Sequence, residues 1–223
     1  MKKRLWIDGA IAWSMPVITV LFLAWPAVYV FHGHAADNIL DVLGMIAVLK
    51  GCIIRLSARG HKREFPRWDL VTTGPYAVTR NPMYLGSFLI GAGFVLIVWP
   101  WWALPVYGLA FYWRFNREVL KEEEQLAGCH KTNYEEYAKN TARVFPSLRA
   151  VMRTKTRDVF NLEEMISTKD RWNLVFMPLA AVLLDTIQEG RLFGGFDIAA
   201  SVGIFAVTIV IFYMVFAISY KVH

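Results

Sequence analysis

The chain has 223 residues, of which 56% are hydrophobic, and its formal net charge is +6 at pH 7. This hydrophobic share is above that of ordinary soluble domains, which argues against a purely soluble protein. The cations lie between apolar runs, as membrane topology and contact with anionic headgroups require, so we expect no nucleic-acid partner.

Six apolar segments predict an all-α, polytopic membrane protein. Ala10–Phe31 and Ile198–Tyr220 contain no Asp, Glu, Lys or Arg and reach the roughly 20 residues that a bilayer crossing requires. The other four predicted spans are shorter or contain a charge: Ile39–Ile54, Pro82–Pro100, Ala103–Trp113 and Trp172–Ile187.

Basic and non-basic connectors alternate along the chain. The N-terminus and the stretches 55–80 and 114–171 hold nearly all Lys and Arg residues, and such segments stay on the cytoplasmic side. We therefore expect both termini in the cytoplasm and a location in the inner (plasma) membrane. Ala10–Phe31 is too long for the apolar part of a cleavable signal peptide, and the two cysteines imply no disulfide.

Three parts are expected: a four-span core with a cytoplasmic segment, a linker or interfacial helix, and a two-span hairpin, over residues 1–148, 149–171 and 172–223. The fourth helix is expected to leave the bilayer and to end at Gly128, a residue type favoured after the last turn. Val159, Leu162 and Ile166 recur about one turn apart. This spacing predicts an interfacial amphipathic helix, with a solvated linker as the alternative.

Arg80, Asn81 and Pro82 stand at the predicted start of the third span. Asn is favoured at the N-cap of a helix and Pro at its first position. The free backbone amides and the positive end of the helix dipole therefore face the cytoplasm beside Arg80, where they attract anionic groups. An ordinary helix cap beside a topology-determining arginine is the alternative interpretation.

Glycines follow two stripes of this third helix. Gly86 and Gly93 share one stripe and indicate close packing against another helix. Gly91 lies below Tyr84 on the other stripe, where it leaves room for a flat ligand or for a neighbouring helix.

The segment "REVLKEEEQL" places Glu122 and Glu123 just outside the fourth span. Carboxylates gain nothing from an anionic leaflet, but beside Arg117 they can accept hydrogen bonds from hydroxyl groups. If the third and fourth spans are neighbours, an arginine, free amides and carboxylates lie at one membrane level. These groups complement a ligand with a carboxylate, a cation, a ribose diol and an aromatic base, such as S-adenosylmethionine.

Two motifs, "GPYAVTRNPMYLG" and "EEEQLAGCHKTNYEEYAKNTARVFP", resemble those of the isoprenylcysteine carboxyl methyltransferase and phospholipid methyltransferase superfamily of integral membrane enzymes. The resemblance covers about residues 40–148. The first motif is matched by Gly74, Tyr76, Arg80, Asn81, Pro82, Tyr84 and Gly86. The second is matched by Glu122, Glu123, Leu126, Tyr134, Tyr137, Arg143 and Pro146.

The resemblance implies a methyltransferase that uses S-adenosylmethionine and a lipid-like or other hydrophobic acceptor. It implies catalytic roles for Glu122 and for Arg117, which is displaced by one residue from the family's arginine. With Gly91 added from the helical geometry, the expected cofactor contacts are Tyr76, Arg80, Asn81, Pro82, Tyr84, Gly91, Glu122 and Glu123. The chain departs from the family at His130 and Lys131, where a Phe-Gly pair is usual, and at Asn81, where the prenylcysteine enzymes have His.

Two alternatives stay open. A phospholipid N-methyltransferase needs a base near its amine, and the first motif contains no histidine, which favours an oxygen or sulfur acceptor. A non-catalytic scaffold or transporter subunit is the alternative of another class, because Asp41, Lys50 and Asp185 lie within predicted spans. We expect both aspartates to reach the membrane interface and Lys50 to extend towards it. No metal site is expected, since two histidines, His32 and His34, do not make one.

Overall fold

The computed structural model describes residues 18–22, 24–25, 29, 34–66, 68–147, 150, 152, 154–193 and 198–222. These residues form helices and no strand, which confirms the predicted all-α class. In chain order the elements are α2 (His34–Arg63), the 3-10 helix η2 (Gly74–Ala77), α3 (Pro82–Val98), α4 (Ala103–Asn140), α6 (Thr156–Val159), α7 (Leu162–Ser167), the 3-10 helix η3 (Lys169–Trp172), α8 (Asn173–Phe193) and α9 (Ile198–Val222). The predicted first span, Ala10–Phe31, lies largely outside the described residues.

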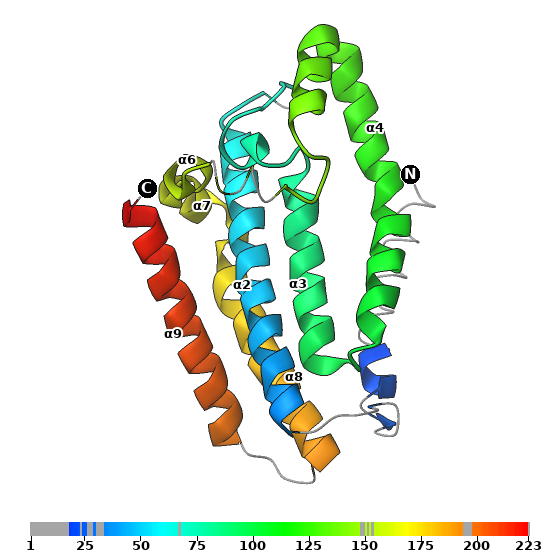
Figure 1. The fold of residues 1–223 in the computed structure, drawn as a ribbon, viewed down its shortest axis with the longest axis vertical. Coiled ribbons are helices and arrows are strands. Elements are labelled where there is room, and N and C mark those ends of the chain that lie inside the picture. Colours follow the sequence, from blue (N-terminus) through cyan, green and yellow to red (C-terminus); the bar gives the residue numbers. More distant parts are fainter. Residues whose placement is uncertain are drawn as a thin grey trace.

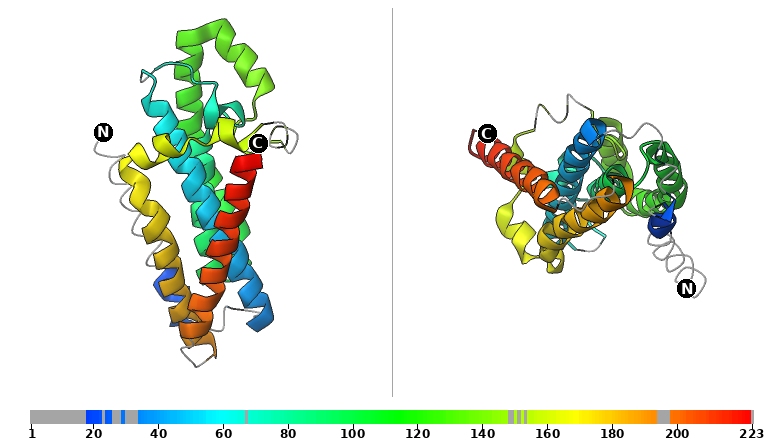
Figure 2. Two further views of the ribbon diagram at one scale, coloured as in Figure 1. Left: turned by 90° about the vertical axis from the view of Figure 1, so that its left-hand side faces the viewer. Right: turned by 90° about the horizontal axis from the view of Figure 1, so that it is seen from below.

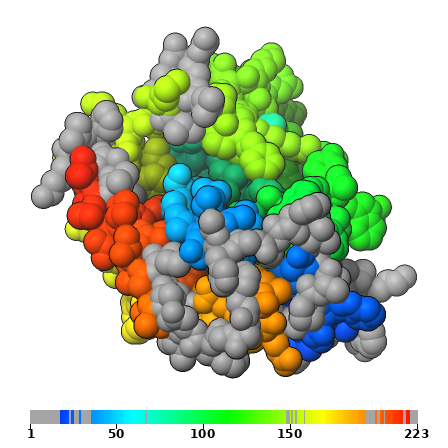
Figure 3. Space-filling model, turned by 60° about the horizontal axis from the view of Figure 1, so that its bottom comes forward, coloured from blue at the N-terminus to red at the C-terminus, as the bar shows by residue number. Residues whose placement is uncertain are grey.

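The long helices run along one axis (Figure 1). α2, α3 and α4 stand side by side, and α8 and α9 contact α2 on its other flanks. The short helices α6 and α7 cross this bundle near the end of α2 (Figure 2). At the opposite end, the start of α2 lies beside the end of α8 and the start of α9 (Figure 3).

Except for α3, which ends at Val98, the observed long helices extend beyond the apolar runs that predicted them. α2 has 30 residues and α4 has 38, and α8 continues to Phe193 with Pro178 inside it. In the described part of the chain, no helix combines the length and the apolar character needed to cross a membrane. The six-span arrangement stays a prediction.

Glycines set the distance between α2 and α3. A Cβ atom on Gly86 would lie 2.7 Å from the carbonyl oxygen of Gly51, and one on Gly93 would lie 2.5 Å from that of Gly44. The two backbones are thus in contact, as expected for helices that meet through small residues. The packing role predicted for Gly86 and Gly93 is confirmed.

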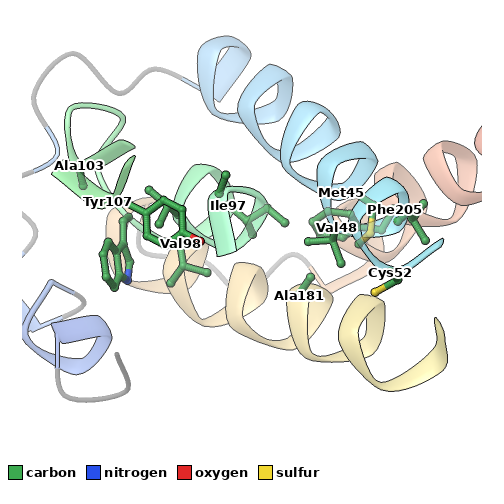
Figure 4. Packing of buried hydrophobic residues seen from close by; sticks show 13 residues of the cluster. Met45, Val48, Cys52, Ile97, Val98, Ala103, Tyr107, Ala181 and Phe205 are labelled. Carbon is green, nitrogen blue, oxygen red and sulfur yellow. The ribbon is translucent and has the colours of Figure 1, made fainter. Parts of the chain in front are cut away.

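A continuous apolar core joins α2 to the other long helices (Figure 4). Met45, Val48 and Cys52 of α2 lie against Ala181 of α8 and Phe205 of α9, and all five are almost fully buried. The C-terminal helices are therefore packed onto the same core as the helices that carry the motifs.

Three aspartates are enclosed between α2 and α8. Asp41 is 2% exposed and Asp185 is 1% exposed, and Gln188 Nε2 donates a hydrogen bond to Asp37 Oδ1 at 3.4 Å. The expectation that Asp41 and Asp185 reach the membrane interface is wrong, because the packed helices cover both. Lys50 does lie on the exposed surface.

The helix α4 reverses direction at Lys131, not at Gly128. Lys131 has φ 32° and ψ −107°, while Gly128 stays helical. The predicted end at Gly128 is wrong, because the chain turns three residues later. Lys131 stands where the family usually has glycine, and it adopts the positive φ that glycine adopts most easily. Beyond it the chain returns as a helical segment that ends at Asn140 (Figure 1).

The stretch predicted as one amphipathic helix forms two short ones, α6 and α7. Asn161 interrupts it by capping α7, since its Oδ1 accepts a hydrogen bond from the backbone N–H of Glu163 at 3.0 Å. Met165 is buried, whereas Leu162 and Ile166 are exposed. The predicted single continuous helix is therefore not formed, whereas the role of this stretch as an interfacial segment or a linker stays a prediction.

Candidate active site

Backbone hydrogen bonds bring the two motifs together. Thr79 and Ala142 form an isolated parallel bridge, and the N–H of Arg80 donates to the carbonyl of Ala142 at 2.8 Å. The Thr79 hydroxyl adds a bond to the carbonyl of Val144 at 2.8 Å. The return of the chain after Lys131 thus places the end of the second motif beside the start of α3.

A polar cavity of about 660 Å³ lies between the first motif, residues 118–126 of α4 and the returning segment that holds Tyr134 and Tyr137. This volume is within the range of small-molecule sites, roughly 300–1,000 Å³. Its lining includes seven of the residues predicted from the sequence: Tyr76, Arg80, Asn81, Pro82, Tyr84, Glu122 and Glu123.

Glu123 is the centre of a charged cluster on one wall of this cavity. Its Oε2 lies 3.0 Å from Nε of Arg143, and its Oε1 lies 3.6 Å from Nη2 of Arg80. The side chain of Asn81 donates to Glu123 Oε1 at 3.2 Å and to the carbonyl of Arg143 at 2.9 Å. Glu123 is therefore held by three side chains from both motifs.

Asn81 precedes Pro82 at the start of α3, as predicted, but its side chain does not cap the helix. The amide is used instead for the bonds to Glu123 and Arg143. The predicted cap is wrong in its chemistry because Glu123 and the Arg143 carbonyl offer acceptors to the amide group. The N-terminal amides of α3 stay directed at the cavity end of the helix, where the helix dipole is positive.

Tyr84 and Glu122 face each other across the gap between α3 and α4. The Tyr84 hydroxyl donates to Glu122 Oε1 at 2.9 Å, and the Tyr84 ring lies 5.6 Å from that of Phe115. This bond orients a carboxylate that has fewer charged neighbours than Glu123. Glu122 is thus better placed to accept hydrogen bonds from a ligand.

Tyr76, Tyr134 and Tyr137 form the remaining polar wall. The Tyr137 hydroxyl donates to the carbonyl of Tyr76 at 2.7 Å, and Arg80 Nη1 lies 3.4 Å from the Tyr134 hydroxyl. Burial, with a smaller contribution from Glu122, raises the pKa of Tyr76, and burial likewise raises the pKa of Tyr137. Both hydroxyls stay protonated at neutral pH and act as hydrogen-bond donors.

An apolar pocket of about 240 Å³ adjoins the polar cavity along α3 and α4. Aromatic rings dominate its wall, including Phe88, Phe111, Phe115 and Phe145, and Arg143 is also part of the lining. Tyr84 lines both spaces. A polar ligand and an apolar ligand can therefore occupy adjoining sites that share the Tyr84 wall.

Two predicted site residues lie elsewhere. Arg117 is on the exposed face of α4, and the lining of neither space includes it. Gly91 faces the hydroxyl of Tyr107, which fills the space where a side chain would project. The room that the sequence suggested at Gly91 is used for packing between α3 and α4, because Tyr107 also donates to the carbonyl of Phe88 at 3.2 Å.

Several residues at the site received no role from the sequence. Arg143, Tyr134 and Tyr137 matched the second motif, so the motif itself was a usable signal for them. Trp68 and Lys62 also line the polar cavity, but the loop that carries them has no distinguishing pattern. Lys62 is fixed there by a bond from its Nζ to the carbonyl of Asp69 at 2.7 Å.

Comparison with known proteins identifies the motif-bearing region. Residues 39–132 match the phospholipid methyltransferase family model. The chain is 33% identical over 123 residues to a protein-S-isoprenylcysteine O-methyltransferase from Xenopus laevis, covering 50% of this chain and 42% of that protein. It is 28% identical over 109 residues to a nickel-cobalt-cadmium resistance protein, NccN, from Alcaligenes xylosoxydans xylosoxydans, covering 49% of this chain and 51% of that protein.

The match thus spans about half the length of these curated relatives. No solved structure matches the chain. The family model nevertheless covers the first motif and the paired glutamates, and one of the relatives is a named methyltransferase. These findings confirm the resemblance predicted from the motifs: the motif-bearing region is similar to the isoprenylcysteine carboxyl methyltransferase and phospholipid methyltransferase superfamily.

Proposed function

We propose that the protein is an integral membrane methyltransferase that uses S-adenosylmethionine to methylate the polar end of a lipid-like acceptor. The observation that carries this proposal is the adjacency of a polar cavity and an aromatic pocket at Tyr84. A methyl donor of high polarity and an acceptor of low polarity must meet, and these two spaces provide for both.

The residues of the polar cavity fit S-adenosylmethionine. Arg80 supplies a half-buried guanidinium whose buried Nε has no hydrogen-bond partner among the described residues, and the start of α3 adds a positive helix end. Both favour the carboxylate of the methionine part. Glu122 offers acceptor oxygens to the ribose hydroxyls or to the amino group. When bound, S-adenosylmethionine supplies a methyl group on a positively charged sulfur.

The protein's contribution is alignment. Displacement at a sulfonium requires the acceptor atom to lie in line with the bond that breaks, and positioning of this kind is worth roughly 7–11 kcal/mol of barrier lowering. Tyr84 is suited to that role, because its hydroxyl is fixed by Glu122 and its ring borders the aromatic pocket. The aromatic rings keep water away from the acceptor.

Arg143, rather than Arg117, is the arginine suited to the acceptor. It lines the aromatic pocket and is held by Glu123 at 3.0 Å and by Asn116 Oδ1 at 3.4 Å. A guanidinium in the lining of an apolar pocket favours an anionic head such as a carboxylate.

The lining of the aromatic pocket also bears on the reaction type. No His, Asp or Glu is among the described residues that form it. An amine acceptor must lose a proton and needs a base, whereas a carboxylate needs none. The lining therefore favours a carboxylate acceptor over a phospholipid amine, which is the alternative within the family.

The outer faces of the helices support placement in a membrane. Leu109 and Trp113 of α4 are each 72% exposed, and Leu179 and Leu183 of α8 are each 61% exposed. Apolar surface of this extent is unfavourable in water and is suited to lipid tails. Trp101 and Trp102 lie exposed before α4, where interfacial tryptophans are frequent. The proposal therefore includes six spans with both termini in the cytoplasm.

Binding of S-adenosylmethionine to the purified protein in detergent tests the proposed function. We expect calorimetry to detect binding to the wild type and a loss of about ten- to a hundredfold in Arg80→Lys, because lysine keeps the charge but loses the planar fork that pairs with a carboxylate. Arg80→Ala should lose at least as much.

Membrane orientation, read from reporter fusions, is the control for these variants. An arginine that serves topology alone would let Arg80→Lys bind like the wild type, and that result would remove Arg80 from the site. A wild type that binds no S-adenosylmethionine would instead support the non-catalytic alternative. Labelled S-adenosylmethionine offered with extracted membrane lipids then identifies the acceptor.

A further inference from the structure

The end of α2 holds the C-terminal segment that follows the second motif. Arg59 forms an ion pair with Asp170, and Arg63 Nη1 donates to the carbonyl of Ser167 at 2.8 Å. Between them, Nδ1 of His61 lies 3.0 Å from Oε2 of Glu164. This segment is thus attached to α2 by polar contacts along the last turns of the helix.

Close packing fixes the position of Glu164. A side chain at Gly60 would overlap the backbone carbonyl of Glu164, so α2 and α7 touch directly. Met165 is buried at 3% exposure, in a cluster with Ile53. The Glu164 carboxylate is further oriented by Asn161, whose Nδ2 donates to Oε1 at 3.2 Å.

The opposite nitrogen of His61 faces the first motif. Its Nε2 lies 2.9 Å from Oγ1 of Thr73, the residue just before η2. Gly74 follows with φ +59°, and a Cβ there would lie 2.8 Å from Cδ2 of His61. The imidazole therefore occupies the space beside Gly74 and fixes where the turn begins.

That turn carries part of the cavity wall. Tyr76 belongs to η2 and lines the polar cavity, and its carbonyl accepts the hydrogen bond from Tyr137 at 2.7 Å. His61 itself is not among the cavity residues. A series of contacts outside the cavity therefore links the C-terminal segment to the cavity wall. It runs from Glu164 to His61 and Thr73, and from there to Tyr76 and Tyr137.

We propose that His61 is a positioning residue that couples the C-terminal segment Asn161–Asp170 to the first motif, so that this segment sets the affinity of the polar cavity for its ligand. The inference rests on the proposed function for the identity of that ligand, S-adenosylmethionine. It assigns a role at the site to a part of the chain that lies beyond the matched family region.

Two pairs of matched substitutions test the coupling. Thr73→Val removes the hydroxyl and keeps the shape, whereas Thr73→Ser keeps the hydroxyl. Glu164→Ala removes the acceptor, whereas Glu164→Gln keeps one. We expect the first member of each pair to weaken S-adenosylmethionine binding about three- to tenfold, and the second to stay near the wild type. Arg63→Met is the control, because it breaks a contact in the same interface that does not lead to the motif.

The double variant Glu164→Ala/Thr73→Val separates coupling from general destabilisation. Both changes act through the same imidazole ring. We therefore expect the double variant to bind S-adenosylmethionine about as weakly as whichever single variant binds it less tightly. Losses that multiply would overturn the inference, as would an equal loss in Arg63→Met.

Hydrogen exchange of the amides in residues 73–77 provides a readout that needs no ligand. We expect faster exchange in Thr73→Val and Glu164→Ala than in Arg63→Met. If the wild type binds no S-adenosylmethionine, the proposed function fails, and exchange rates then decide the coupling alone. Equal exchange in all three variants would overturn it.

Discussion

Single side chains connect the two spaces of the site. The Tyr84 hydroxyl donates a hydrogen bond to Glu122, and Tyr84 also lines the aromatic pocket. The Arg143 guanidinium forms an ion pair with Glu123, and Arg143 lines the same pocket. Each residue therefore carries one polar and one apolar function, and substitutions can remove them separately.

Tyr84→Phe tests the polar function of Tyr84. The variant keeps the ring and loses the bond that orients Glu122, so we expect S-adenosylmethionine affinity to fall about three- to tenfold by calorimetry. Tyr84→Ala, which also opens the aromatic wall, should in addition reduce methyl transfer at saturating S-adenosylmethionine. Equal behaviour of the two variants would contradict a separate role for the hydroxyl.

Arg143→Gln tests which arginine serves the acceptor, with Arg117→Gln as the matched control. Arg143 lines the aromatic pocket and Arg117 is exposed. We expect the KM for an acidic lipid acceptor to rise about tenfold or more in Arg143→Gln, as loss of a charge-assisted bond predicts, and to stay unchanged in Arg117→Gln. The reverse pattern would restore the role that the sequence suggested for Arg117.

At the scale of elements, the path of α4 decides whether a site exists. The helix carries Glu122 and Glu123 outward and then reverses at Lys131, so that Tyr134 and Tyr137 return towards η2. At this reversal Lys131 adopts a positive φ of 32°, a conformation that costs a non-glycine residue on the order of 1–3 kcal/mol.

Lys131→Gly should therefore stabilise the protein. The gain from relieving the positive φ exceeds the entropy cost of glycine in the unfolded chain, and we expect a net increase of about 1 kcal/mol in the free energy of unfolding. Thermal unfolding in detergent measures it. Lys131→Ala, which keeps the Cβ and removes the charge, is the control and should bring no gain; an equal gain in both variants would point to charge instead of backbone strain.

Sequence patterns predicted the apolar parts of the helices well. They predicted the positions at which helices end in polar segments less well. Gly86 and Gly93 indicated close packing, and the structure pairs them with Gly51 and Gly44. Gly128 failed as a helix end because propensity there is weaker than the tertiary contacts that fix the reversal.

At the scale of the whole molecule, topology is the main expectation still to be measured. Reporter fusions after Lys62, Lys155 and His223 should all report the cytoplasm, because basic segments beside membrane spans are generally retained there. A fusion within residues 99–102 should report the opposite side. A non-cytoplasmic signal from the fusion at His223 would mean that either the fifth or the sixth predicted span does not cross the membrane.

Most residues of the polar cavity wall were indicated by the sequence, although Arg117 and Gly91 lie outside it, and the contacts that join these residues were not predictable. The motifs indicated Arg80, Glu122 and Glu123, and the structure places all three on one cavity. The role of Arg143 depends on a chain reversal about a dozen residues earlier, and the role of His61 depends on a contact with Glu164 103 residues away. Local patterns contain no information on such contacts.

The parallel bridge between Thr79 and Ala142 has a consequence for the order of folding. It joins residues that are 63 positions apart in the sequence, and the neighbouring bond from Thr79 to Val144 joins residues 65 positions apart. Closing loops of this length slows assembly. The pairing of α2 with α3 through glycines can form first, whereas the polar cavity closes only after α4 has reversed. Local opening of the bridge would then abolish ligand binding while the helix pair persists, and a bound ligand would stabilise the closed form in proportion to its concentration.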